Sequence, residues 1–242
     1  MRLPSLPFSL PARLLAGVAP LALAGACIGS AQAQAIEKID LDGTSVNLTI
    51  PAGYCKLDRN VGRGAYELQE RMNTGVNRVL VLFIECNELK RAMADPKARY
   101  THHGSYLAPL NNGRATKIPA NLSRTQALDE MSKAIPAMDP DTVQGRVNAR
   151  TGAEGVSLSK VTTGLLARDT NAAYVAIAAN ANAPQSPARN VPPERFRGVV
   201  FITVLKGYAI SGNLFAPVEP GAPFDKLLAQ QKVNAAAAVK AN

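Results

Sequence analysis

The two histidines of the chain, His102 and His103, are the residues whose type most directly suggests chemistry. A neutral imidazole can bind a transition metal, and it can act as an acid or base near pH 7. However, adjacent residues of a strand point to opposite faces, so this pair is poorly placed to hold one metal ion. No H-E-x-x-H motif or cysteine–histidine set accompanies them. We therefore expect no metal site and no cofactor, and interpret both as strand or loop residues.

Three other stretches resemble catalytic motifs without completing one. The segment Gly155–Ser159 lacks the second glycine of the G-x-S-x-G nucleophile elbow. The segment Gly62–Gly64 is too short for a phosphate-binding loop. Asp129 and Glu130 are neighbours on an expected helix, where their carboxylates diverge. Binding without catalysis is the favoured interpretation. The alternative is a small hydrolase or metal-dependent enzyme with a non-standard site near His102, His103 and Tyr106.

The cysteines indicate an oxidising compartment. Of the three in the chain, Cys55 and Cys86 lie outside the N-terminal segment, and a lone pair in an exported protein most simply forms a disulfide. The alternatives are a metal-binding or a redox pair. The two are not a C-x-x-C motif, and no third or fourth ligand is evident, so we predict a disulfide between them.

The first 35 residues have the organisation of a secretory signal peptide. Arg2 and Arg13 precede an apolar run over residues 14–26, and A-x-A cleavage sites follow at residues 31–33 and 33–35. We expect cleavage after Ala35. A retained anchor is the alternative, but the run is shorter than the roughly 20 residues of a spanning helix and contains Pro20. We therefore expect a periplasmic or secreted bacterial protein with no transmembrane span after cleavage.

Cys27 offers a second interpretation of the same segment. The sequence Leu23-Ala24-Gly25-Ala26-Cys27 resembles the lipobox of bacterial lipoproteins, in which the cysteine is acylated and becomes the first residue. The minority alternative is therefore a membrane-anchored lipoprotein that acts as an assembly factor.

The charge of the chain gives little guidance to a partner. Without residues 1–35 the chain has 25 basic against 18 acidic residues, a formal charge of +7. The basic residues are scattered, with no zinc-finger spacing and no cluster of basic and aromatic residues. We expect no nucleic-acid partner. The expected partner is a protein or small molecule of the cell envelope.

The elements that must position these residues are clearest near the C-terminus. Residues 195–205 and 208–215 are two β-branched and aromatic runs about Lys206-Gly207, which predicts a β-hairpin with Tyr208, Ile210, Gly212 and Leu214 on one face. Residues 224–239 predict a helix that covers this hairpin. Its apolar stripe is partial and gives way to an alanine-rich tail; the stripe consists of Phe224, Leu227, Leu228 and Val233.

The rest of the chain alternates strands and helices. Strands are expected over residues 36–41, 45–50, 78–86, within 99–108, 155–168 and 173–178. Helices are expected over residues 64–73 and after Ser123, which begins a capping box, with Pro136 and Pro140 closing that region. Residues 183–193, rich in Pro, Asn and Ser, are expected to be a mobile loop. This order predicts one α+β domain over residues 36–242, an antiparallel β-sheet with helices packed on it in the manner of an α/β/α sandwich.

The two ends of this domain resemble the PsbP-like α/β/α sandwich group. The resemblance lies in Val46–Tyr54, a short strand followed by a proline, a glycine and an aromatic residue, and in the C-terminal hairpin with its closing helix. That family commonly has Trp where this chain has Tyr54. The resemblance implies a non-enzymatic accessory or binding role and transfers no functional residues.

Overall fold

The structure is a computed structural model that describes residues 35–95, 100–135, 139–152, 157–182, 194–218 and 224–242. Residues 1–34 of the expected signal peptide, including Cys27, and the expected loop over residues 183–193 lie outside the described residues.

The predicted C-terminal hairpin is confirmed and lies in the middle of the main sheet. Strand β9 (Glu194–Leu205) pairs along its length with β10 (Tyr208–Pro217). Lys206 and Gly207 both have positive φ, 49° and 81°, as the two central residues of a type I′ turn require. The twist of that turn matches the right-handed twist of the strands that it joins.

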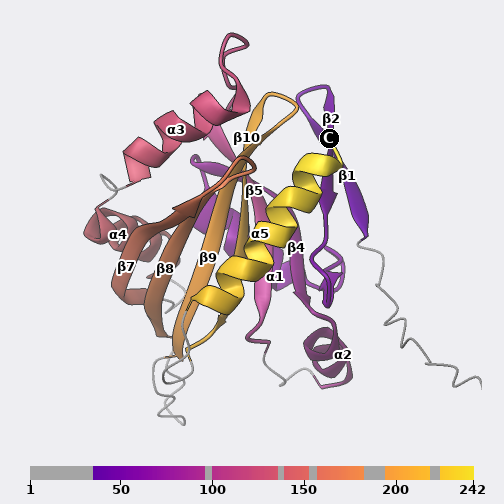
Figure 1. Ribbon diagram of the computed structural model, residues 1–242. Coiled ribbons are helices and arrows are strands. Elements are labelled where there is room, and N and C mark those ends of the chain that lie inside the picture. The colour runs from indigo at the N-terminus through magenta and orange to yellow at the C-terminus, as the bar shows by residue number, and fades with distance from the viewer. Residues whose placement is uncertain (1–34, 96–99, 136–138, 153–156, 183–193, 219–223) are drawn as a thin grey trace, which may run out of the picture. The chain divides into compact units, whose positions relative to one another are not determined.

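The other strands add to this hairpin on both sides, and every neighbouring pair is antiparallel. The order is β3-β4-β5-β10-β9-β8-β7, and β6 pairs with β5 outside this path. Strands β1 and β2 form a separate hairpin (Figure 1). The bounds are β1 (Ile36–Leu41), β2 (Thr44–Thr49), β3 (Tyr54–Lys56), β4 (Asn77–Glu85), β5 (His103–Asn111), β6 (Arg114–Ala115), β7 (Ser157–Arg168) and β8 (Ala173–Asn182).

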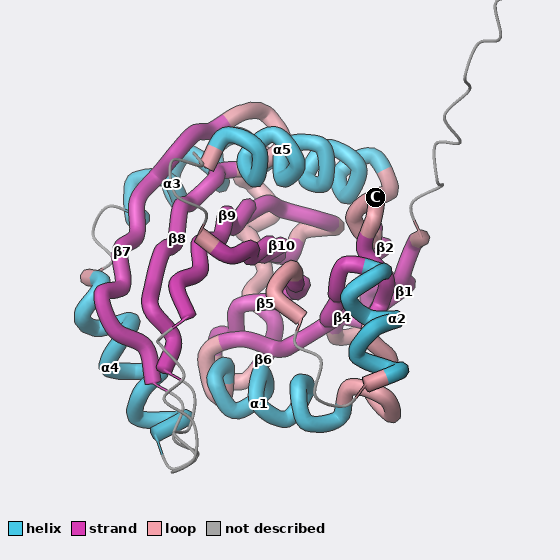
Figure 2. Tube along the Cα trace, turned by 90° about the horizontal axis from the view of Figure 1, so that it is seen from below, coloured by secondary structure: helices cyan, strands magenta, loops and turns pink. Residues whose placement is uncertain are grey.

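Helices cover both faces of the main sheet, which confirms the predicted α+β class. Helix α5 (Asp225–Lys240) packs on β9, β10 and β2, and we call this side the α5 face. Helices α1 (Arg63–Asn73), α3 (Arg124–Ala134) and α4 (Pro140–Thr151) pack on the other side, the α1/α4 face. Figure 2 shows α5 along one side of the strands and α1 along the other. Helix α2 (Cys86–Ala94) lies against β3 and β4.

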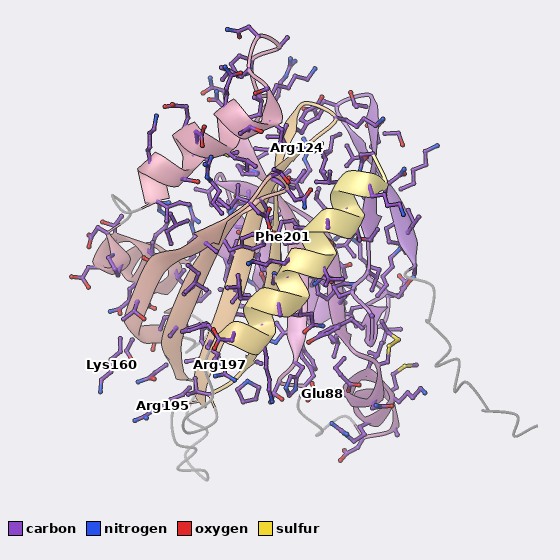
Figure 3. The ribbon with its side chains drawn as sticks, in the orientation of Figure 1. Glu88, Arg124, Lys160, Arg195, Arg197 and Phe201 are labelled. Carbon is purple, nitrogen blue, oxygen red and sulfur yellow. A yellow bond between two sulfur atoms is a disulfide. The ribbon has the colours of Figure 1, made fainter. Side chains whose placement is uncertain are left out.

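The α5 face carries the largest core. Phe201, Tyr106 and Tyr174 are almost fully buried there, together with residues of the β1–β2 hairpin such as Leu48, and Figure 3 labels Phe201 on β9 next to α5. The buried stripe of α5 consists mainly of small and polar side chains: Leu227, Gln231, Asn234, Ala235 and Ala238.

The predicted stripe of α5 is wrong at Val233, whose side chain is 62% exposed. The alanine-rich tail is instead the part that packs, with Ala235 and Ala238 fully buried. Gln231 lies on the same face, where its Nε2 donates to the carbonyl oxygens of Val199 and Gly212. A search for large apolar residues misses such a stripe because its members are small or polar.

Pro140 does not close the helical region, as the sequence suggested, but begins α4. Proline suits the first helical position because its missing N–H would have no partner there. The Asp139 carboxylate caps the helix by accepting from the backbone N–H groups of Asp141 and Thr142. Helix α2 was also not expected. By contrast, the capping box at Ser123 is present at the start of α3.

The part of the chain that the structure describes contains no helix long and apolar enough to cross a membrane.

Candidate binding site

A cavity of about 320 Å³ lies between the sheet and the helices of the α1/α4 face. A second, of about 230 Å³, adjoins it and shares Gln69, Tyr100, His103 and Phe215. None of the described residues that line either cavity is charged. The larger cavity is lined by Gln69, Met72, Tyr100, Thr101, His103, Val143, Val147, Leu158, Val161, Ile177, Ala179, Ala181, Phe196, Phe215 and Pro217.

The strand period and the helix period together build the walls of the larger cavity. Ile177, Ala179 and Ala181 are alternate residues of β8, so all three side chains lie on the same face of the sheet. On the opposite wall, Val143 and Val147 are four residues apart on α4, which places both on one side of the helix.

A hydrogen bond from a side chain of α4 to the backbone of α1 joins the two helices beside the cavity. Arg150 of α4 donates from Nη1 to the carbonyl oxygen of Met72 in α1, at 2.8 Å. The two helices also contact each other directly. They therefore form one wall over the sheet.

Aromatic rings form the end of the cavity where β5, β9 and β10 meet. His103 stacks on Phe215 with ring centroids 5.4 Å apart and planes 27° from parallel. Phe196 and Tyr100 meet this pair edge to face, at 5.7 Å from Phe215 and 6.1 Å from His103. Gly198 makes room for the stack, because a Cβ there would collide with the ring of Phe215.

His103 presents an uncharged imidazole to this site. Burial lowers the pKa of His103, and the Thr101 backbone and the Glu88 carboxylate offset this only in part. The Nδ1 atom is enclosed and has no hydrogen-bond partner among the described residues. The ring lines both cavities, so it is placed to meet a ligand.

His102 lies in a different environment, beside Glu88 at the start of α2. Its Nδ1 is 2.9 Å from Glu88 Oε1, and its backbone N–H donates to Oε2 at 2.8 Å. The Thr101 hydroxyl and N–H also donate to this carboxylate. Burial alone would raise the pKa of Glu88, but these hydrogen bonds outweigh it and lower the pKa to about 2. Figure 3 shows Glu88 where β4 leads into α2.

The structure does not bring together the three residues of the suggested enzyme site. Tyr106 points to the α5 face, where its hydroxyl donates to the Thr49 carbonyl oxygen at 2.8 Å. His103 points to the α1/α4 face, and His102 turns towards Glu88. Within the described ranges, no group of three or more His, Cys, Asp or Glu residues is placed to hold a metal ion.

Each of the other residues considered in the sequence analysis either contacts another side chain or lies at the start of a helix or strand. Cys55 and Cys86 form the predicted disulfide, which ties β3 to the start of α2. Asp129 pairs with Arg168 and Glu130 with Lys133, all on partly or fully exposed side chains. Ser157 opens β7, and the segment Gly62–Gly64 leads into α1.

Sequence reasoning missed most of the cavity. Its aromatic and aliphatic residues come from helices and strands far apart in the chain, and none belongs to a motif. The sequence contains only weak indications of the residues that line the cavity. Val143 and Val147 are an apolar i, i+4 pair, and Phe196 and Phe215 are aromatic residues near the open end of the predicted hairpin.

No protein-family model matches this chain, and no curated protein matches it.

Proposed function

We propose that this protein is an exported cell-envelope protein that works by binding, and that the cavity on the α1/α4 face receives a small apolar molecule. The observation that carries the proposal is the cavity of about 320 Å³ with uncharged, mainly apolar walls. Ligand pockets in proteins commonly enclose about 300 to 1,000 Å³ and combine apolar walls with a few polar groups. His103 is such a polar group.

Two further features support the cellular setting. A disulfide persists in oxidising compartments such as the bacterial periplasm, and Cys55 and Cys86 form one. The pattern of residues 1–35 is that of a signal peptide. The resemblance to the PsbP-like group implies the same kind of role, a non-enzymatic accessory or binding module.

The binding proposal is tested with an apolar fluorescent probe, N-phenyl-1-naphthylamine, which brightens on leaving water. We expect saturable brightening with the unmodified protein and its loss in Ala181→Phe, which fills the cavity. Ala178→Phe is the matched control, because Ala178 is on the same strand but pairs with Arg197 on the other face. Brightening that is absent, or equal in both variants, would contradict the proposal.

Export is tested by the intact mass of the protein from the envelope fraction. We expect a mass that starts at Ile36. A mass that starts at an acylated Cys27, with membrane association lost in Cys27→Ser, would favour the lipoprotein assembly factor. A full-length mass would contradict signal cleavage.

The contact between His102 and Glu88 favours a hydrolase as the second candidate. A carboxylate on Nδ1 orients an imidazole and leaves Nε2 available as a base. Hydrolysis of p-nitrophenyl acetate above the buffer rate, lost in His102→Ala and kept in His103→Phe, would support that candidate. An equal rate in all three proteins would end it.

A further inference from the structure

We infer that the cavity takes an uncharged lipophilic molecule of about two fused rings with a hydroxyl group, and that His103 hydrogen-bonds to that hydroxyl. This inference rests on the proposed function and deepens it, since it names the class of ligand.

The volume of the cavity sets the size of the ligand. An apolar protein cavity of about 150 Å³ holds one benzene molecule. The cavity on the α1/α4 face, at about 320 Å³, is roughly twice as large, and the adjoining cavity extends it past Tyr100 and His103. Two fused rings therefore fit the larger cavity.

The aromatic end of the cavity favours rings over a flexible chain. His103 and Phe215 stack, and Phe196 and Tyr100 meet them edge to face. Aromatic pairs are favourable beyond their buried area when their centroids lie about 4.5 to 7 Å apart. A rigid ring system extends this arrangement and loses little conformational freedom on binding.

The polar groups around the cavity favour a ligand that carries a hydroxyl group. Besides His103, the Gln69 amide and the Tyr100 hydroxyl line both cavities. The Thr101 hydroxyl already donates to Glu88, and the Ser105 hydroxyl accepts from Asn213 Nδ2 at 2.9 Å. His103 has ring contacts but no hydrogen bond from its enclosed Nδ1 to the described residues. A neutral imidazole has one nitrogen that donates and one that accepts, and a hydroxyl can match either.

The charge of the ligand follows from the walls. No lysine or arginine is among the described residues that line either cavity, so a buried carboxylate or sulfonate would have no ion-pair partner. The hydroxyl compound is therefore preferred over the corresponding acid.

The test compares 2-naphthol with naphthalene, which lacks the hydroxyl, and with 1-dodecanol, which carries it on a flexible chain. The chain contains no tryptophan, so naphthol emission can be followed without that background. We expect 2-naphthol to bind about tenfold tighter than naphthalene, the effect of one well-made hydrogen bond. His103→Phe keeps a ring against Phe215 but removes both nitrogens, and it should make the two affinities equal. Thermal unfolding of His103→Phe checks that the variant is folded.

Each outcome separates this inference from the proposed function. Equal binding of 2-naphthol and naphthalene, or an unchanged ratio in His103→Phe, would overturn the hydrogen bond while the binding function stands. Tighter binding of 1-dodecanol would overturn the ring system in the same way. Failure of all three compounds and of N-phenyl-1-naphthylamine would overturn both proposals.

Discussion

Glu88 is the residue whose ionisation should matter most for folding. Its side chain is only 8% exposed, and its carboxylate accepts four hydrogen bonds from Thr101 and His102. Because its pKa falls from 4.5 to about 2 on folding, the ionised form stabilises the native state above about pH 4.5. That contribution should be lost as the pH falls towards 2.

We therefore expect Glu88→Gln to lower the free energy of unfolding at pH 7 by about 1.5 to 3 kcal/mol, the usual range for hydrogen bonds to a charged group. Urea unfolding at a series of pH values measures this, and the gap to the unmodified protein should narrow below pH 4.5. Glu130→Gln is the control, because Glu130 pairs with Lys133 at the surface. A gap that does not change with pH would contradict the argument.

Gly104 is needed for the close approach of β5 to β10. A Cβ at this position would collide with the Asn213 carbonyl oxygen and with the Phe83 ring. We expect Gly104→Ala to destabilise the protein by about 1 to 3 kcal/mol, as overpacked sites do. Gly145→Ala on α4 is the control, since its Cβ meets nothing, and it should be neutral or stabilising. Thermal unfolding compares the two, and a Gly104→Ala protein as stable as the control would contradict this prediction.

At the scale of elements, the end of α5 is fastened to β2 by two asparagines. The Asn242 side chain accepts from the Asn47 N–H at 3.0 Å and donates to the Asn47 carbonyl oxygen at 2.7 Å. Asn47 in turn donates from Nδ2 to the Ala241 carbonyl oxygen at 2.8 Å. These bonds hold the last turn of α5 over the separate β1–β2 hairpin.

We expect Asn242→Ala to cost about 2 kcal/mol and Asn47→Ala about 1 kcal/mol, since the first removes more bonds. The double variant should cost less than the sum, because one loss already frees the end of the helix. Urea unfolding of the four proteins measures the coupling. Equal losses of stability in the two single variants, or a double variant whose loss equals their sum, would contradict this role of the two asparagines.

The sequence predicts those helices and strands whose own residues form a recognisable apolar, turn or capping pattern. The hairpin of β9 and β10 has two apolar runs and a turn at Lys206-Gly207, and the start of α3 has a complete capping box. Helix α4 has neither an apolar stripe nor a helix-forming centre, since Gly145 lies between Val143 and Val147. Its stability comes from packing on β7 and α1, which no local pattern reports.

The candidate site was harder to predict than the fold. His103 could be picked out as chemically interesting, but its role depends on Phe215, Tyr100 and the wall of α4, which only the folded chain brings near it. The adjacent His102 shows the limit of the sequence argument. The two histidines contact different groups, but His102 lies just before β5 and outside the strand on which the sequence argument rested. The partner of each histidine could not be predicted.

At the scale of the whole molecule, the two faces of the sheet differ in how completely they are filled. The α5 face is filled by the largest core, with Tyr106, Tyr174 and Phe201 nearly inaccessible. The α1/α4 face retains cavities beneath its helices. Substitutions that enlarge or fill the cavities should therefore change ligand binding with less effect on stability than substitutions of equal size on the α5 face.

The disulfide between Cys55 and Cys86 acts on the whole chain through the unfolded state. The two residues are 31 positions apart, and a cross-link over such a loop stabilises a protein by about 3 to 4 kcal/mol on the chain-entropy model. We expect the Cys55→Ser, Cys86→Ser double variant to lose about this much in urea unfolding. Dithiothreitol should lower the unfolding midpoint of the unmodified protein and leave that of the variant unchanged.

The cross-link also fixes the start of α2, two residues before Glu88. If the variant keeps the pH dependence of stability attributed to Glu88, the contact between Glu88 and His102 holds without the disulfide. If dithiothreitol does not change the unfolding midpoint of the unmodified protein, the disulfide contributes nothing to stability.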